Sequence, residues 1–105
     1  MPQFTVYRNR NAATRARFPL LLDVQSDLLE PLGTRVVIPL SPAGAARSRS
    51  METLTPTVLF EGKRYVMLTP QLAGIAAREL GPAAGNVASE RDAIIASLDL
   101  LITGI

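Results

Sequence analysis

The hydrophobic pattern of this 105-residue chain changes period near Ser89, and this change limits the folds that the chain can adopt. Before Ser89, short β-branched and aromatic runs are bounded by glycine, proline and polar residues, which is typical of strands. After it, apolar residues recur at helical spacing and form a stripe: Ile94, Ile95, Leu98, Leu101 and Ile102. Several strands followed by one terminal helix predict a compact, mainly antiparallel β domain with the helix packed on or beside the sheet.

The clearest hairpin in the chain joins Thr57–Phe60 to Lys63–Leu68. Gly62, the second turn residue, accepts the positive φ that a tight hairpin needs. The other predicted strands are Phe4–Tyr7, Leu20–Val24 and a central Arg35–Leu40 strand that ends near its proline.

The segments between these strands are predicted from the glycine, proline and small polar residues that interrupt the apolar runs. We expect loops at Ser41–Ser50 and Gly81–Gly85, a turn at Pro31 and Gly33, and either a strand or a short helix at Thr69–Ile75.

The helical segment ends in a small apolar tail. Ser89 with Asp92 is the expected N-cap pair, and Gly104 is the expected C-terminal stop. The apolar stripe is predicted to pack in the core, whereas Ile105, which follows a glycine, is suited to fill a pocket on a partner. Because the tail has to be buried against its own sheet, a second copy or a target protein, we expect the function to reside there.

Composition limits the function classes. The length suits a single domain over residues 1–105, and 48% hydrophobic residues allow a modest core that dimerisation would help. Residues 1–10 lack the apolar middle of a secretory signal and no apolar run could span a bilayer, so a cytoplasmic protein without membrane contact is expected. Cysteine and histidine are absent, and we find no metal cluster, glycine-rich phosphate loop or nucleophile triad, so no cofactor, metal or catalytic residue is predicted.

The basic residues are unevenly distributed, although the formal net charge is only +2. Four arginines without a neighbouring carboxylate occupy the first 18 residues: Arg8, Arg10, Arg15 and Arg17. A phosphate-binding patch is possible, but a solvated hairpin that protects its edge with charge is favoured, so no direct nucleic-acid binding is expected. Asp23 and Asp27, four residues apart across a strand end, are predicted to be turn and cap acceptors rather than a catalytic pair.

Several motifs resemble the CcdB family of plasmid and chromosomal toxins. They are Gln3–Tyr7, Leu22–Leu29, Arg35–Leu40, the hairpin before Met67, and Leu100–Ile105. The resemblance covers essentially the whole chain, and its most specific parts are Asp23-Val24-Gln25-Ser26-Asp27 and the Gly-Ile ending. It implies an SH3-like barrel shared with the MazF and Kid toxins, with a five-stranded antiparallel sheet, a smaller sheet and a C-terminal helix, and it implies a homodimer.

The resemblance also implies a type II toxin that is not an enzyme. Toxins of this family bind the A subunit of DNA gyrase, hold gyrase on cleaved DNA, and are neutralised by the disordered tail of a CcdA antitoxin. The acidic tail of such an antitoxin is expected to contact the four N-terminal arginines, with Arg47 and Arg49 adding charge.

Carried over position by position, the resemblance places gyrase binding at Leu28, Leu29, Asp99, Ile102, Thr103, Gly104 and Ile105. The family's terminal tryptophan is Thr103 here, a phenylalanine is Ile102 and an asparagine is Asp99. Losing an indole from an interface often costs about 2 kcal/mol or more, and a new carboxylate alters complementarity. Three alternatives therefore stay open: the protein recognises a divergent gyrase, it binds gyrase weakly, or it has lost toxicity.

Two other functions also stay open. One is a MazF-like endoribonuclease that uses Arg17 or another N-terminal arginine with a carboxylate such as Asp23. The other is a non-toxic homologue that binds only antitoxin. The detailed resemblance favours the gyrase-directed toxin, because the ribonucleases share only the fold.

Overall fold

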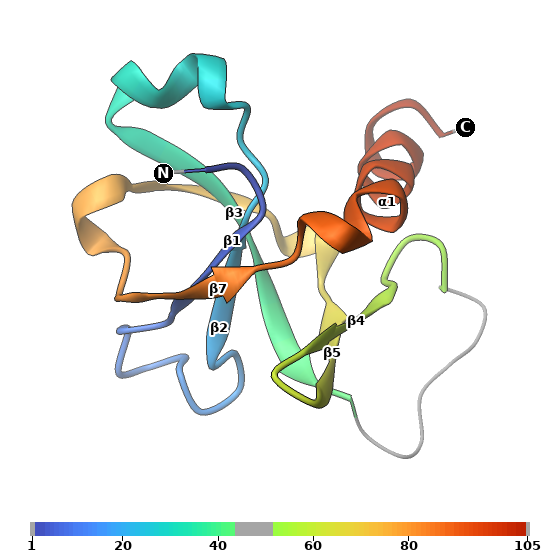
Figure 1. Cartoon of the computed structure of the whole chain (residues 1–105), viewed down its shortest axis with the longest axis horizontal. Helices are drawn as coiled ribbons and strands as arrows, with labels where there is room; N and C mark the ends of the chain where they lie inside the picture. Colours follow the sequence, from blue (N-terminus) through green and yellow to red (C-terminus); the bar gives the residue numbers. More distant parts are fainter. Residues whose placement is uncertain (1, 44–51, 105) are drawn as a thin grey trace.

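The computed structural model describes residues 2–43 and 52–104, which form a curled antiparallel sheet with one C-terminal helix (Figure 1). The strands are β1 Thr5–Arg8, β2 Leu20–Asp23, β3 Thr34–Pro42, β4 Thr57–Phe60, β5 Lys63–Met67, β6 Ala73–Ala76 and β7 Ala83–Asn86. Helix α1 is Arg91–Thr103, and the 3₁₀ segments are η1 Asp27–Leu32, η2 Thr69–Gln71, η3 Ala77–Glu79 and η4 Ala88–Glu90. The predicted class, mainly β with a terminal helix, is confirmed.

Strand β3 joins all parts of the sheet. The hydrogen-bonded order is β4-β5-β3-β2-β1-β7, and β6 pairs with β3 outside this path. One side of β3 pairs with β2, while the other side pairs with β6 near Thr34 and with β5 near Pro42. The smaller sheet that the resemblance implied is therefore continuous with the main sheet through β3 in the described part of the chain. The expectation that this strand ends near Pro39 is wrong, because Pro39 pairs opposite Leu21 and the strand continues to Pro42.

The predicted hairpin of β4 and β5 is confirmed. Its turn residues Glu61 and Gly62 have φ values of 51° and 78°, as the twist-matched two-residue turn requires. The ambiguous Thr69–Ile75 segment contains both expected structures, since η2 is followed directly by β6. Of the loop predicted from Ser41, the first residues extend β3, and residues 44–51, with Arg47 and Arg49, lie outside the described residues.

The loop predicted at Gly81–Gly85 is wrong, because β7 occupies most of it and pairs with β1. Glycine, proline and alanine suggested a loop, but small residues here fit an edge strand that lies close to Phe60. The N-cap prediction is also wrong. Ser89 lies within η4, and the capping position is Glu90, whose side chain makes no capping hydrogen bond. Gly104 ends α1 as predicted, with φ 76° and its N–H bonded to the Leu100 carbonyl.

The main core lies between the inner face of the curled sheet and the first turns of α1. Ile94 has no exposed surface, and Ile95 and Leu98 pack at the edge of this core. Ser97 is also buried, and its hydroxyl donates to the Ile94 carbonyl at 2.8 Å. Ile102 is 72% exposed, so the prediction that the whole apolar stripe is core is wrong for the last turn, which extends beyond the sheet (Figure 1). None of the described helices is long and apolar enough to cross a membrane.

Candidate functional site

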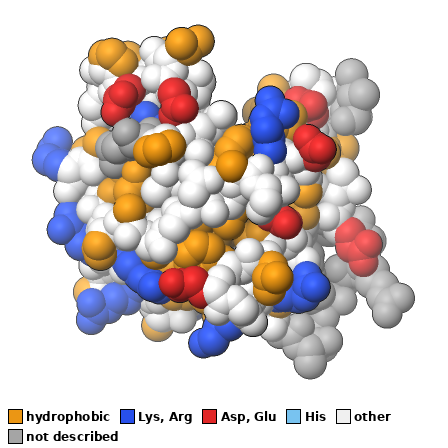
Figure 2. All heavy atoms as spheres, viewed as in Figure 1, with side chains coloured by type: hydrophobic (Ala, Val, Ile, Leu, Met, Phe, Trp, Pro, Cys, Tyr) orange, Lys and Arg blue, Asp and Glu red, His pale blue; other side chains and the backbone are white. Residues whose placement is uncertain are grey.

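Two apolar elements project from the same end of the molecule. Leu28 of η1 is 89% exposed and Leu29 is 47% exposed, and both were predicted to bind gyrase. On α1, Ile102, Thr103 and Gly104 are exposed, as is Asp99. Figure 1 shows η1 and the end of α1 on opposite sides of the upper edge of this view, and Figure 2 shows the two corresponding lobes separated by a recess. The structure places the predicted residues on one end of the molecule in two separate groups, and Ile105 lies outside the described residues.

Hydrogen bonds from the Asp-Val-Gln-Ser-Asp motif hold η1 in place. The Ser26 hydroxyl accepts from the Leu28 N–H at 3.2 Å, and the Gln25 side-chain amide donates to the Leu29 carbonyl at 3.1 Å. The Asp27 carboxylate accepts from the Gln3 N–H at 2.7 Å, which ties the helix start to the N-terminal segment. The predicted cap role of Asp27 is wrong, because Ser26 is the N-cap and Asp27 instead accepts from a distant backbone N–H, while the motif as a whole fixes the orientation of the exposed leucines.

Asp23 of the same motif forms a buried ion pair with Arg35. The Arg35 Nε donates to Asp23 Oδ2 at 2.7 Å, and the two side chains are 1% and 0% exposed. Asp23 Oδ1 accepts from the Gln25 N–H at 3.0 Å, which confirms its turn role, and Arg35 Nη2 donates to the Gln25 carbonyl at 3.3 Å. The hydrogen bond with Asp23 raises the pKa of Arg35 above its ordinary value. Sequence reasoning missed Arg35, although an arginine in a β-branched strand next to a buried motif needs an acidic partner.

This ion pair bears on the ribonuclease alternative. Asp23 is fully buried against Arg35, whereas Arg17 is exposed and lies with its guanidinium carbon 4.8 Å from the centre of the Phe18 ring. Among the described residues the structure therefore does not pair Arg17 with Asp23, and the N-terminal arginine that it does pair with a carboxylate is Arg8, which contacts Glu61 at 3.2 Å.

The end of α1 presents its side chains and backbone to solvent. The Thr103 hydroxyl donates to the Asp99 carbonyl at 2.6 Å, so it is satisfied within the helix. Gly104 has no described neighbour within 4 Å of the position that a Cβ would occupy, although its positive φ disfavours other residues. A partner could thus approach this backbone closely.

The four N-terminal arginines do not form one cluster. Arg8 ends β1 and pairs with Glu61 at 3.2 Å, and Arg10 donates to the Arg78 carbonyl at 2.7 Å. Arg15 and Arg17 lie on the loop after β1 and are exposed. Within the described part of the chain the Arg15 side chain makes no hydrogen bond or ion pair, so it is the arginine most available to an acidic partner.

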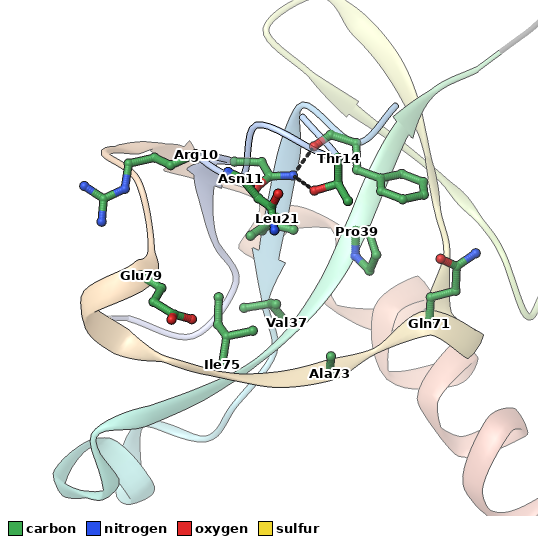
Figure 3. Close-up of a pocket in the computed structure, with 12 residues that line it drawn as sticks. Arg10, Asn11, Thr14, Leu21, Val37, Pro39, Gln71, Ala73, Ile75 and Glu79 are labelled. Atoms are coloured by element: carbon green, nitrogen blue, oxygen red, sulfur yellow. Dashed lines mark hydrogen bonds between the residues drawn. The ribbon is translucent and has the colours of Figure 1, made fainter. Parts of the chain in front are cut away.

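An open groove of about 560 Å³ lies beside this loop on the outer face of the sheet (Figure 3). Its floor is apolar and comes from Leu21 of β2, Val37 and Pro39 of β3, and Ile75 of β6. Its rim is polar: Asn9, Arg10, Asn11, Thr14, Gln71 and Glu79. The Asn9 side chain holds the loop over the groove by donating to the Thr14 hydroxyl and the Phe18 carbonyl. Sequence reasoning missed the groove because its residues come from four separate segments.

The described residues contain no group of three or more acidic, histidine or cysteine side chains that could hold a metal ion. The family model of the CcdB protein matches residues 3–104. The curled antiparallel sheet with a terminal helix agrees with the fold that the resemblance implied. Since the match covers nearly the whole chain, the chain belongs to the CcdB family, the toxins of the CcdA/CcdB toxin–antitoxin system.

Proposed function

We propose that this protein binds the A subunit of DNA gyrase as a homodimer, traps the gyrase–DNA cleavage complex, and is neutralised by a CcdA-like antitoxin. The observation that supports gyrase binding is the exposure of large apolar side chains at one end of a small domain, namely Leu28, Leu29 and Ile102. Apolar side chains grouped in this way mark interaction surfaces, because leaving them in water has a free-energy cost that a partner removes. The mechanism is binding alone, so no residue is assigned to catalysis.

The exposed last turn of α1 supports the homodimer. Ile102 lies in that turn, Leu101 beside it is only half-buried, and the core beneath α1 ends before them. A second copy that packs its own α1 against Leu101 would bury that side chain and leave Ile102 to the target protein. Analytical ultracentrifugation at micromolar concentration should give twice the monomer mass of 11.3 kDa, and a monomer at that concentration would contradict this part of the proposal.

The groove and the arginine loop support antitoxin binding on a different surface. An acidic, apolar segment that is disordered when free could place apolar side chains over Leu21 and Ile75 and its carboxylates near Arg10 and Arg15. Because this surface lies on the outer face of the sheet, antitoxin and gyrase would use separate parts of the protein. A protein that bound antitoxin but left gyrase unaffected would be the non-toxic homologue.

The test is a supercoiling and DNA-cleavage assay with gyrase from the source organism. The parent protein should inhibit supercoiling and accumulate cleaved DNA, and added antitoxin should reverse both effects. The double variant Leu28→Ser/Leu29→Ser should lose both effects, while the control Leu59→Ser, which removes a 53% exposed leucine of β4, should keep them. Full supercoiling without cleaved DNA at saturating parent protein would overturn the gyrase assignment. RNA incubated with the protein should stay intact, and cleavage abolished by Arg17→Ala would favour the ribonuclease.

A further inference from the structure

The short helix η1 exposes a third leucine that the proposed gyrase contacts do not include. Leu32 is 61% exposed, and none of the six residues of η1 is buried. A 3₁₀ helix has three residues per turn, so residues three apart lie on the same edge, about 6 Å from each other along the axis. Leu29 and Leu32 therefore share one edge, Leu28 and Pro31 share a second, and Asp27 and Glu30 share the third.

This arrangement makes η1 a ridge with two apolar edges and one acidic edge. The apolar edges do not serve the fold, because none of their side chains enters the core. An exposed leucine ordinarily needs no explanation, but three on one six-residue helix are a concentrated apolar surface. Figure 2 shows apolar side chains at the top of the lobe that η1 forms in Figure 1, with acidic side chains directly below them.

The ridge is also held rigidly at both ends. Ser26 and Asp27 fix its start through hydrogen bonds, and Gln25, which is bonded to the buried Arg35–Asp23 pair, donates to the Leu29 carbonyl. At its end, Gly33 turns the chain with φ 74°, and its carbonyl accepts from the Ala77 N–H at 2.9 Å. Pro31 restricts the backbone φ angle inside the helix. A surface that is already ordered loses less conformational entropy when it binds, which favours affinity.

From these observations we propose that Leu32 is a further anchor for the target protein and that Leu29 and Leu32 together insert into an apolar pocket with a basic rim. The rim follows from charge complementarity, because the Asp27 carboxylate lies on the ridge with a neutral backbone N–H as its partner, and no basic residue lies within η1. The inference rests on the proposed function and assigns this pocket to the gyrase A subunit. A second anchor on η1 offsets part of the affinity that Thr103 loses relative to an indole at the end of α1.

The test measures binding of purified gyrase A subunit by titration calorimetry to the full-length protein and three leucine variants. Leu32→Ser should weaken binding about tenfold, as truncation of an interface anchor commonly costs more than 1 kcal/mol. Leu32→Met keeps an apolar side chain of similar volume and should stay within about twofold of the parent. The matched control Leu59→Ser should also stay within about twofold, because β4 lies outside the ridge. All variants should keep the parent's thermal midpoint, since neither leucine is buried.

The outcomes separate this inference from the proposed function. If the parent binds gyrase and Leu32→Ser binds equally well, the inference is overturned and the proposed function stands. If the parent does not bind gyrase at all, the proposed function is overturned, and the inference with it. A Leu32→Ser protein that sediments at half the parent's mass would instead assign the ridge to the contact between two copies and overturn the inference. Asp27→Asn keeps an oxygen that accepts from the Gln3 N–H and should make binding less sensitive to salt than in the parent, and equal salt dependence would overturn the basic rim.

Discussion

The ring of Phe60 in β4 lies directly against the backbone of Gly85 in β7. A Cβ atom on Gly85 would lie 2.7 Å from Cε1 and 3.0 Å from Cζ of that ring. Since β4 and β7 are the two ends of the hydrogen-bonded strand order, this contact joins the two edges of the curled sheet. The ion pair between Arg8 and Glu61 connects the same regions at 3.2 Å. The absence of a side chain at position 85 is therefore what allows the curl to close.

Gly85→Ala should destabilise the protein. The added methyl group has to displace the Phe60 ring from a packed core, and such overpacking costs about 1–3 kcal/mol of unfolding free energy. Gly74→Ala in β6 is the matched control, because nothing lies within 4 Å of its Cβ position, and it should change stability by less than about 0.5 kcal/mol. Urea denaturation of both variants tests this, and equal stabilities would show that the ring adapts without cost.

Arg35→Met should be far more destabilising than the loss of an exposed ion pair. It leaves Asp23 buried without its charge partner, which costs about 3–5 kcal/mol. Arg8→Met removes the Arg8–Glu61 pair, whose side chains are about half exposed, so its cost should be about 0–1 kcal/mol. Denaturant titration compares the two variants, and similar losses would mean that burial does not raise the cost of breaking the Arg35–Asp23 pair.

The elements that could be predicted from the sequence are those whose signals are local. The β4–β5 turn needed only Gly62, and the stop of α1 needed only Gly104. Strand β7 could not be predicted, because its glycine is required by Phe60, which lies 25 residues earlier in the chain. Exposure of Ile102 could not be predicted either, since helical spacing shows which residues share a face but not where the sheet beneath them ends.

The candidate site also contains some residues that could be predicted from the sequence and others that could not. Leu28 and Leu29 were placed by the family resemblance, and the structure exposes them as a binding role requires. Arg35 and the floor of the groove depend on register across β2, β3 and β6, which no local pattern specifies. Leu32 was missed because only the 3₁₀ geometry places it on the same edge as Leu29.

Stability should fall at alkaline pH because of Tyr7. Burial, and then the nearby Asp23 carboxylate, raise the pKa of Tyr7 above its ordinary value of 10.0. A raised folded-state pKa contributes stability that is fully present below pH 10 and is lost as pH rises above 10 through the folded-state value. The parent should therefore lose more unfolding free energy than Tyr7→Phe between pH 9 and pH 11.5 (roughly one unit below to 1.5 above that pKa). Denaturant curves across this window test it, and parallel losses in the two proteins would assign the alkaline effect to other groups.

Arg15→Ala should weaken binding of an acidic antitoxin tail and reduce its salt dependence. Unlike Arg8 and Arg10, the Arg15 side chain has no competing contact among the described residues, so its charge is available to the peptide. Arg64→Ala removes another exposed arginine, from β5, and serves as the control. Fluorescence titration at low and high salt should show a loss of about 1.4- to 5-fold for Arg15→Ala alone, since an exposed charge pair contributes about 0.2–1 kcal/mol. The same loss in both variants would indicate attraction by net charge without a defined site.

Thr103→Trp should strengthen gyrase binding and toxicity. Thr103 is exposed and bonded only within its own helix, so an indole fits there without disturbing the core and supplies an anchor that commonly contributes about 2 kcal/mol. Ala96→Trp places an indole on an exposed position of the same helix and is the control for non-specific apolar binding.

Deletion of Ile105 provides the opposite test of the same end of the chain. We expect it to weaken gyrase binding while changing unfolding free energy by less than about 1 kcal/mol, because the neighbouring Gly104 is exposed and outside the core. Affinity measurements and cell-killing assays on Thr103→Trp, Ala96→Trp and the deletion should rank in that order, from strongest to weakest. If Ala96→Trp gains as much as Thr103→Trp, or the deletion kills as well as the parent, target binding does not depend on the end of α1 and must rest on the η1 ridge alone.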